Sequence, residues 1–195
     1  GDPPADAHEV AVAGEWWVSF RDPPDKLPYG ARVRGEEVPT RIVIRKATKD
    51  DAQAIWDVRV AAIGAQCRGF YSDAILEAST SGEPDDRFAD WVESSFHVAV
   101  DGDRVLGSGA IDLNSGQIPW LFVLPEQMGK GIGSQIMIYL ENLAAEAGLK
   151  ETYLDSTLNA APFYRKCGYQ GNDLGVYQSP RGYNLDCVPM RKALE

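Results

Sequence analysis

The feature that most constrains this chain is a glycine-rich segment between a predicted strand and a predicted helix. It reads EQMGKGIGSQIM, residues 126–137. It follows the apolar run of residues 120–124, and residues 136–144 carry apolar side chains at helical spacing. Glycine permits positive φ and close backbone approach, and the first N–H groups of a helix lack helical partners. The segment therefore predicts an anion site at the start of a helix.

Two well-known anion-binding motifs fit this segment poorly. A P-loop needs a Ser or Thr after its lysine, whereas Lys130 is followed by Gly131. A dinucleotide fold matches the order strand, glycines, helix and strand, and Asp155 would then be the ribose ligand. That fold needs a glycine where Ser134 stands, and its first glycine should lie closer to the strand than Gly129 does. An ordinary glycine-rich turn remains the plain alternative.

A second motif lies downstream and reads LNAAPFYRKCGY, residues 158–169. With Val123, Pro125 and the segment 129–134, it resembles the GNAT superfamily of acyl-CoA-dependent N-acyltransferases. The resemblance covers about residues 41–193. It implies an α/β (α+β) fold of the GNAT type, with a mixed central sheet of about six to seven strands flanked by helices. The anion would then be the pyrophosphate of coenzyme A.

Local patterns predict the order of elements along the same range. Asp101-Gly102-Asp103 and 114–116 are turn signals between strands, and Thr48 is a helix cap. The expected strands are 42–44, 96–100, 104–113, 117–124, 151–156 and two more between 175 and 190. The expected helices follow Thr48, cover about 72–79 and 88–94, end at Gly148, and lie within 159–168.

The two ends of the chain differ from this central domain. Residues 1–40 are rich in proline, and we interpret them as an N-terminal arm that packs on the domain or on a second copy of the chain. A partly disordered extension is the other reading, and a homodimer stays open. We expect residues 194–195 to be a remnant of a tag.

Composition limits the partners that we expect. The net charge of −10 disfavours nucleic acid and suits a cationic amine, although solubility alone also explains it. No apolar run approaches the ~20 residues of a membrane helix, and the first residues do not resemble a secretory signal. The three cysteines, Cys67, Cys167 and Cys187, favour a reducing compartment, and none has partners at metal spacing. We therefore expect a cytoplasmic protein without a metal.

The resemblance also assigns residues to the binding of acetyl-CoA. The cofactor-binding set comprises Phe122, Val123, Met128, Gly129, Lys130, Gly131, Ile132, Gly133, Ser134, Asn159 and Phe163. Asn159 matches the family asparagine near the pantetheine arm, and the plain alternative is a helix cap. Phe122 or Val123 would supply a backbone N–H to the developing oxyanion.

Tyr164 matches the general-acid tyrosine of the family, which would protonate the departing thiolate. The plain alternative is a core aromatic. Many relatives place a glutamate on the strand before Val-x-Pro, but residues 117–124 contain no acid. Asp112, Asp155, His97 and a water chain stay open as the base. For His97 a core role is favoured, and Cys167 is interpreted as a small apolar contact rather than a nucleophile.

The expected function is transfer of an acetyl group from acetyl-CoA to a primary amine of a small molecule or peptide. Phe70, Tyr71 and Trp120 are candidates for the acceptor pocket, with core packing as the alternative for each. A non-catalytic acyl-CoA-binding module of the same fold is the alternative function. A nucleotide-dependent oxidoreductase is a third hypothesis, and it predicts NAD(H) binding.

Met128 stands where the family usually has Arg or Gln. We predict that Met128→Arg lowers the Kd for CoA, because a well-made charge-assisted hydrogen bond contributes roughly 1.5–3 kcal/mol. The affinity stays unchanged if Gln127 already reaches the phosphates. Isothermal titration of CoA measures the effect, and a clear loss of affinity would mean that the motif register is wrong.

Overall fold

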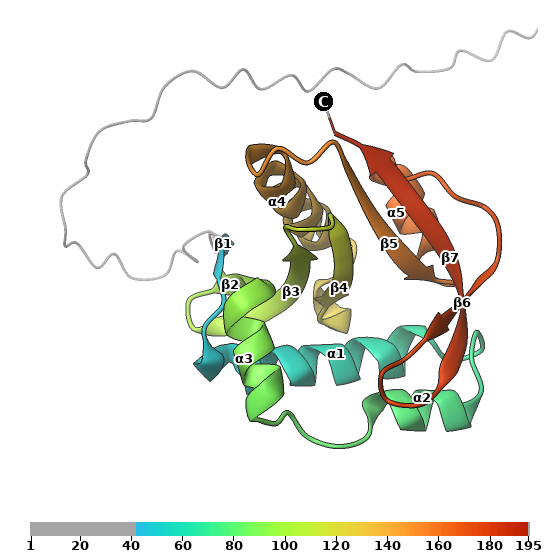
Figure 1. Cartoon of the computed structure of the whole chain (residues 1–195). Coiled ribbons are helices and arrows are strands. Elements are labelled where there is room, and N and C mark those ends of the chain that lie inside the picture. Colours follow the sequence, from blue (N-terminus) through green and yellow to red (C-terminus); the bar gives the residue numbers. More distant parts are fainter. Residues whose placement is uncertain (1–41, 195) are drawn as a thin grey trace, which may run out of the picture. The chain divides into compact units, whose positions relative to one another are not determined.

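The computed structural model describes residues 42–194, which form a seven-stranded sheet in the order β1-β2-β3-β4-β5-β7-β6 (Figure 1). The strands are β1 (Val43–Lys46), β2 (Phe96–Asp101), β3 (Arg104–Asp112), β4 (Gln117–Val123), β5 (Glu151–Thr157), β6 (Gly175–Gln178) and β7 (Asn184–Ala193). Every neighbouring pair is antiparallel except β4 and β5, which run parallel. The predicted mixed sheet of six to seven strands is therefore confirmed.

Helices flank the sheet, as predicted. They are α1 (Ala52–Gln66), α2 (Asp73–Thr80), α3 (Asp86–Ser95), α4 (Ile132–Glu146) and α5 (Ala161–Lys166), with short 3-10 turns η1 (Lys49–Asp51) and η2 (Pro125–Gln127). Two buried clusters form the core. One joins α4 and α5 to the sheet through residues such as Leu140 and Tyr164, and the other joins α1 and α3 through residues such as Ile55 and Val92. No helix formed by residues 42–194 has the length and apolar character needed to span a membrane.

The predicted ends of the chain are only partly covered. The arm assigned to residues 1–40 lies outside the described residues. The backbone N–H of Leu194 donates to the carbonyl of Lys150 over 2.8 Å, and its side chain packs against the core. The assignment of residues 194–195 to a tag stays a prediction.

A β-bulge in β4 changes which face its side chains occupy. Ala110 pairs with Trp120 and Asp112 pairs with Gln117, so two residues of β4, Ile118 and Pro119, lie opposite one residue of β3. Ile118 accordingly joins the α4 cluster, whereas Trp120 joins the α1 cluster. A bulge is also one of the few positions where a sheet tolerates proline, since proline cannot donate to the ladder.

The parallel strands β4 and β5 separate soon after they begin. Their one register pair is Gln117 with Tyr153, and the N–H of Tyr153 donates to the carbonyl of Gly116 over 3.1 Å. Beyond this pair the strands diverge, while α1 crosses the sheet at its lower side in Figure 1. On the edge that faces β5, residues 118–123 of β4 thus border an opening rather than a paired strand.

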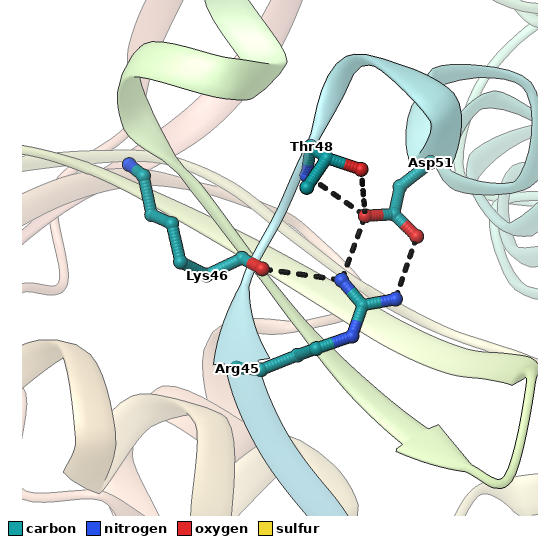
Figure 2. A network of polar contacts seen from close by, with 4 residues as sticks. All are labelled: Arg45, Lys46, Thr48 and Asp51. Carbon is teal, nitrogen blue, oxygen red and sulfur yellow. Dashed lines mark hydrogen bonds and ion pairs between the residues drawn. The ribbon is translucent and has the colours of Figure 1, made fainter.

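A polar network fixes the entry into α1 (Figure 2). Arg45 donates to both carboxylate oxygens of Asp51, over 2.7 and 2.8 Å. The same carboxylate accepts the backbone N–H of Thr48 over 2.8 Å and its hydroxyl over 3.2 Å. Thr48 lies at the predicted cap position, but the side chain that accepts hydrogen bonds there belongs to Asp51. These bonds hold the pKa of the Asp51 carboxyl below its usual value, chiefly through Arg45.

We predict that Asp51→Asn lowers the free energy of unfolding by about 1–3 kcal/mol, because it removes a bidentate charged pair from a mostly buried carboxylate. The folded-state pKa of Asp51 is depressed. Its contribution is therefore present at neutral pH and is lost as the pH falls through that pKa, so wild type and variant converge in acid. Urea unfolding at pH 7 and pH 3 measures both effects.

The exposed pair between Arg191 and Glu151 is the matched control. Glu151→Gln should change the unfolding free energy by less than about 1 kcal/mol. Equal losses from both substitutions would contradict the special role of the Asp51 network.

Candidate active site

The opening between β4 and β5 holds a cavity of about 910 Å³. Its walls come from α1, β4, the glycine segment, β5, α5 and the segment between β6 and β7. The volume lies within the range of small-molecule sites. Most of the site residues predicted from sequence line this one cavity: Trp120, Phe122, Val123, Met128, Gly129, Gly131, Ile132, Gly133, Ser134, Asp155, Asn159, Phe163, Tyr164 and Tyr71.

The three glycines of the segment serve two different purposes. Gly129 and Gly131 have φ of +75° and +83°, a conformation that L side chains rarely adopt, and space around them is open. Gly131 is the residue before α4, so the first N–H groups of the helix face outward at this point. Gly133 lies inside the helix, where an added Cβ would approach the Phe163 ring to 3.2 Å. The first two glycines shape the turn, and the third allows α4 to pack against α5.

The side chains around these glycines do not all face the cavity. Met128 lines it, and its sulfur accepts a hydrogen bond from the Gln66 amide of α1. Gln127 also lines it and accepts a hydrogen bond from Lys130 over 3.1 Å. Lys130 itself is exposed and is not a lining residue. Gln127, the residue before Met128, therefore brings a polar side chain to the cavity.

The free edge of β4 offers backbone donors to the cavity. The N–H of Leu124 donates to the carbonyl of Leu106 in β3 over 2.9 Å. Amides of an antiparallel strand alternate between its two edges, so those of Leu121 and Val123 point away from β3. They face the side on which β5 has separated. Of the two predicted oxyanion donors, Val123 has the amide on the open edge, and Phe122 has it toward β3.

Tyr164 is buried in α5, with 8% of its surface exposed, yet it lines the cavity. Its ring packs at right angles to Phe163 and Tyr169, with centroids 5.1 and 6.0 Å away. Within residues 42–194 its hydroxyl has no hydrogen-bond partner. Burial raises the pKa of this phenol well above its usual value, so it stays protonated at neutral pH. Such a group can donate a proton but is a poor base.

Asn159 does not cap the following helix. The residue before α5 is Ala160, and no side chain caps that helix. Asn159 lines the cavity, where its side-chain oxygen lies 3.6 Å from the thiol of Cys67. The simple capping alternative is thus wrong. The amide NH₂ of Asn159 remains available to a ligand.

The three candidate bases lie in different places. Asp155 is exposed on β5 and lines the cavity. Asp112 is the last residue of β3, outside the cavity, and accepts hydrogen bonds from Asn114 and Ser115 of the turn that follows. These bonds, that of Ser115 first, lower the pKa of its carboxyl. His97 is buried on β2, also outside the cavity, and desolvation lowers its pKa to about 4.

The predicted acceptor residues are also separated. Tyr71 lines the cavity, but its hydroxyl donates to the carbonyl of Asp186 and accepts the N–H of Leu158. It therefore ties the loop after α1 to the residue that follows β5 and to β7. Trp120 is buried, and its indole N–H donates to Ser108 over 3.0 Å. Phe70 is 52% exposed and lies outside the main cavity.

Two arginines of the cavity wall were not predicted. Arg59 in α1 is buried with 7% of its surface exposed, and Arg181 follows β6. Both guanidinium groups lie over the Trp56 ring, 5.0 and 5.2 Å from its centroid. Arg59 could have been found from the sequence, because it falls on the same helical face as Ile55, Trp56 and Ile63.

Comparisons with known proteins bear on the family and the fold of this chain. A family model described as an acetyltransferase (GNAT) domain matches residues 92–171. YjcF, an uncharacterized N-acetyltransferase of Bacillus subtilis (strain 168), is 34% identical over 80 residues, which are 40% of this chain and 57% of that protein. A GCN5-related N-acetyltransferase from Rhodopseudomonas palustris is 26% identical with a TM-score of 0.73, over 82% of this chain and 100% of that chain. All three comparisons support the GNAT superfamily, and the family model matches residues 92–171 of this chain.

Both motifs on which the resemblance rests lie within the matched part of this GNAT domain. YncA from Salmonella typhimurium, determined with acetyl-CoA, shares the fold with a TM-score of 0.59 and 19% identity, over 80% of this chain and 95% of that chain. The alignment with YjcF spans little more than half the length of that relative. The comparisons thus show the fold and support the family, while the reaction and its acceptor depend on the chemistry of the site.

Proposed function

We propose that this GNAT protein transfers an acetyl group from acetyl-CoA directly to a primary amine. One observation carries the proposal. A single cavity brings together the outward-facing N–H groups before α4, the free amide edge of β4 and the hydroxyl of Tyr164. These are an anion cradle, an oxyanion donor and a proton donor. A thioester donor that carries a pyrophosphate needs all three.

The cradle suits the pyrophosphate of acetyl-CoA for physical reasons. Positive φ at Gly129 and Gly131 lets successive N–H groups turn outward, and the dipole of the 15-residue helix α4 favours negative charge there. Gln127 adds a side-chain donor at the same place. Asn159 and Phe163 line the path toward Tyr164, where the pantetheine arm would pass.

The reaction needs three groups around the thioester carbonyl. A neutral amine attacks the carbonyl carbon, and the N–H of Val123 stabilises the negative charge that develops on the oxygen. When the C–S bond breaks, Tyr164 gives its proton to the thiolate of CoA. The C–N bond has then formed, and the amine has lost a proton to a base. The low polarity around Tyr164 raises the basicity of the leaving thiolate as well as the pKa of the phenol.

Asp155 is the base that the geometry favours. It is the carboxylate of the three candidates that reaches the cavity, and its exposure keeps it accessible to water. A carboxylate of this kind can accept the amine proton directly or through one water. The carboxylate of Asp112 already accepts hydrogen bonds from Asn114 and Ser115 of the β3–β4 turn.

We predict that Tyr164→Phe lowers kcat by about 10²–10⁴-fold, the usual contribution of a positioned acid. CoA affinity should be retained, because the cradle is untouched. The measurement is thiol release from acetyl-CoA over a panel of primary amines, with titration of CoA alongside.

Tyr169→Phe is the matched control for that variant. Tyr169 is a neighbouring buried tyrosine whose hydroxyl bonds to Thr152 over 2.7 Å, and it does not line the cavity. The Tyr169→Phe variant should lose stability but keep the kcat of wild type. CoA binding without thiol release on any amine would instead favour the non-catalytic module.

A second comparison separates the two carboxylates. Asp155→Asn should reduce kcat by roughly 10²-fold or more, whereas Asp112→Asn should leave it within about twofold of wild type. The loss in Asp155→Asn should shrink at high pH, where more of the amine is already neutral. A larger loss from Asp112→Asn would overturn the assignment of the base.

A further inference from the structure

The feature that the proposed reaction leaves unexplained is Arg59. Its side chain projects from the apolar face of α1, and only 7% of the residue is exposed. One terminal nitrogen, Nη1, is fully buried and has no hydrogen-bond partner within residues 42–194. A buried guanidinium in this state is costly, because arginine does not lose its proton and the charge has been removed from water.

The surroundings of Arg59 offer no compensating carboxylate. Its guanidinium lies over two indole rings, 5.0 Å from the centroid of Trp56 and 5.4 Å from that of Trp120. Its other polar neighbours are Tyr183, Tyr177 and a second cation, Arg181. No Asp or Glu among the described residues lies within 4.0 Å of either arginine. Burial and the charge of Arg181 both lower the pKa of Arg59.

Arg59 belongs to the same cavity as the acetyl-transfer groups. Trp120, on which it stacks, lies on β4 three residues before Val123. Tyr177 and Asp155 line the same cavity as Arg59. The cavity therefore has a positively charged, aromatic region beside the edge of β4 and the carboxylate of Asp155. None of these residues belongs to the glycine segment that would hold the pyrophosphate.

We propose that the acceptor is an amino carboxylate with an apolar side chain, whose carboxylate binds Arg59. This inference rests on the proposed function, because it names the substrate class of the same site. The guanidinium can hold a carboxylate through two parallel N–H bonds, and Arg181 adds positive charge at the entrance. The aromatic walls at Trp56 and Trp120 accept the apolar side chain. The amine can then point toward Val123 and Asp155.

A zwitterionic acceptor also agrees with the overall charge of the protein. The chain carries a net charge of −10, which favours the approach of a cationic amine. The arginines make the cavity locally different from that surface. The negative surface of the protein would attract the amino group of such an acceptor. Arg59 would bind its carboxylate.

The test uses matched pairs of acceptors that differ in one charge. Phenylalanine is compared with phenylalaninamide, and leucine with leucinamide, in the thiol-release assay. Wild type should prefer the carboxylate member roughly 10- to 100-fold in kcat/KM, the effect of one charge-assisted contact. Arg59→Met should abolish the preference, Arg59→Lys should retain part of it, and Arg104→Gln, an exposed arginine of β3, should leave it unchanged.

A binding measurement separates this proposal from the proposed reaction. N-acetylphenylalanine and its amide are titrated against the full chain, with quenching of tryptophan fluorescence as the signal because Arg59 lies against Trp56 and Trp120. Tighter binding of the charged probe, lost in Arg59→Met and partly kept in Arg59→Lys, supports the anion site even if no amine is acetylated. Thiol release with equal kcat/KM and equal affinity for both members of each pair would overturn it while leaving the reaction intact.

Discussion

The site depends on the separation of two parallel strands. β4 and β5 pair at Gln117 and Tyr153 and then diverge. If the strands stayed paired, their backbone N–H and C=O groups would be hydrogen-bonded to each other, and no cavity would form between them. The bulge at Ile118 and Pro119 follows that pair directly, and bulges bend a strand and increase its twist. Because the strands diverge, the amide of Val123 has no partner strand on this edge. The same divergence lets α4 and α5 line one cavity.

In the proposed reaction, the two ends of this space would recognise ligands by different physical interactions. At the glycine segment, backbone N–H groups and a helix dipole act, and side chains contribute little beyond Gln127. At the other end, Arg59 and the indoles of Trp56 and Trp120 act through charge and surface. The first end is suited to a ligand common to many enzymes, whereas the second can vary with the acceptor. A chain of net charge −10 thus carries a locally cationic pocket, which its average charge conceals.

The elements were predictable because their signals are local. The start of α1 after Thr48, the meander of β2 to β4 and the end of α4 before Gly148 follow from caps, turns and periodicity. The bulge was not predicted, although Pro119 within a strand was a signal for it. Asp112 and Asp155 were indistinguishable in sequence, since each lies at or near the end of a strand. Their surroundings differ because Asp112 accepts hydrogen bonds from the tight turn that follows β3, whereas Asp155 lies beside the opening.

The sequence by itself determined the glycine turn, the α5 motif and the resemblance to the GNAT superfamily, because each depends on residues close together in the chain. Positive φ at Gly129 and Gly131 is a local requirement that only glycine meets readily. The tertiary structure decided what faces the cavity. It placed Asp155 there and Asp112 outside, and it buried Arg59 against Trp120, a residue 61 positions away along the chain. The apolar face of α1 is a local signal for the burial of Arg59, but its contact with Trp120 and its lack of a counterion arise from packing between distant segments, which no local pattern could reveal.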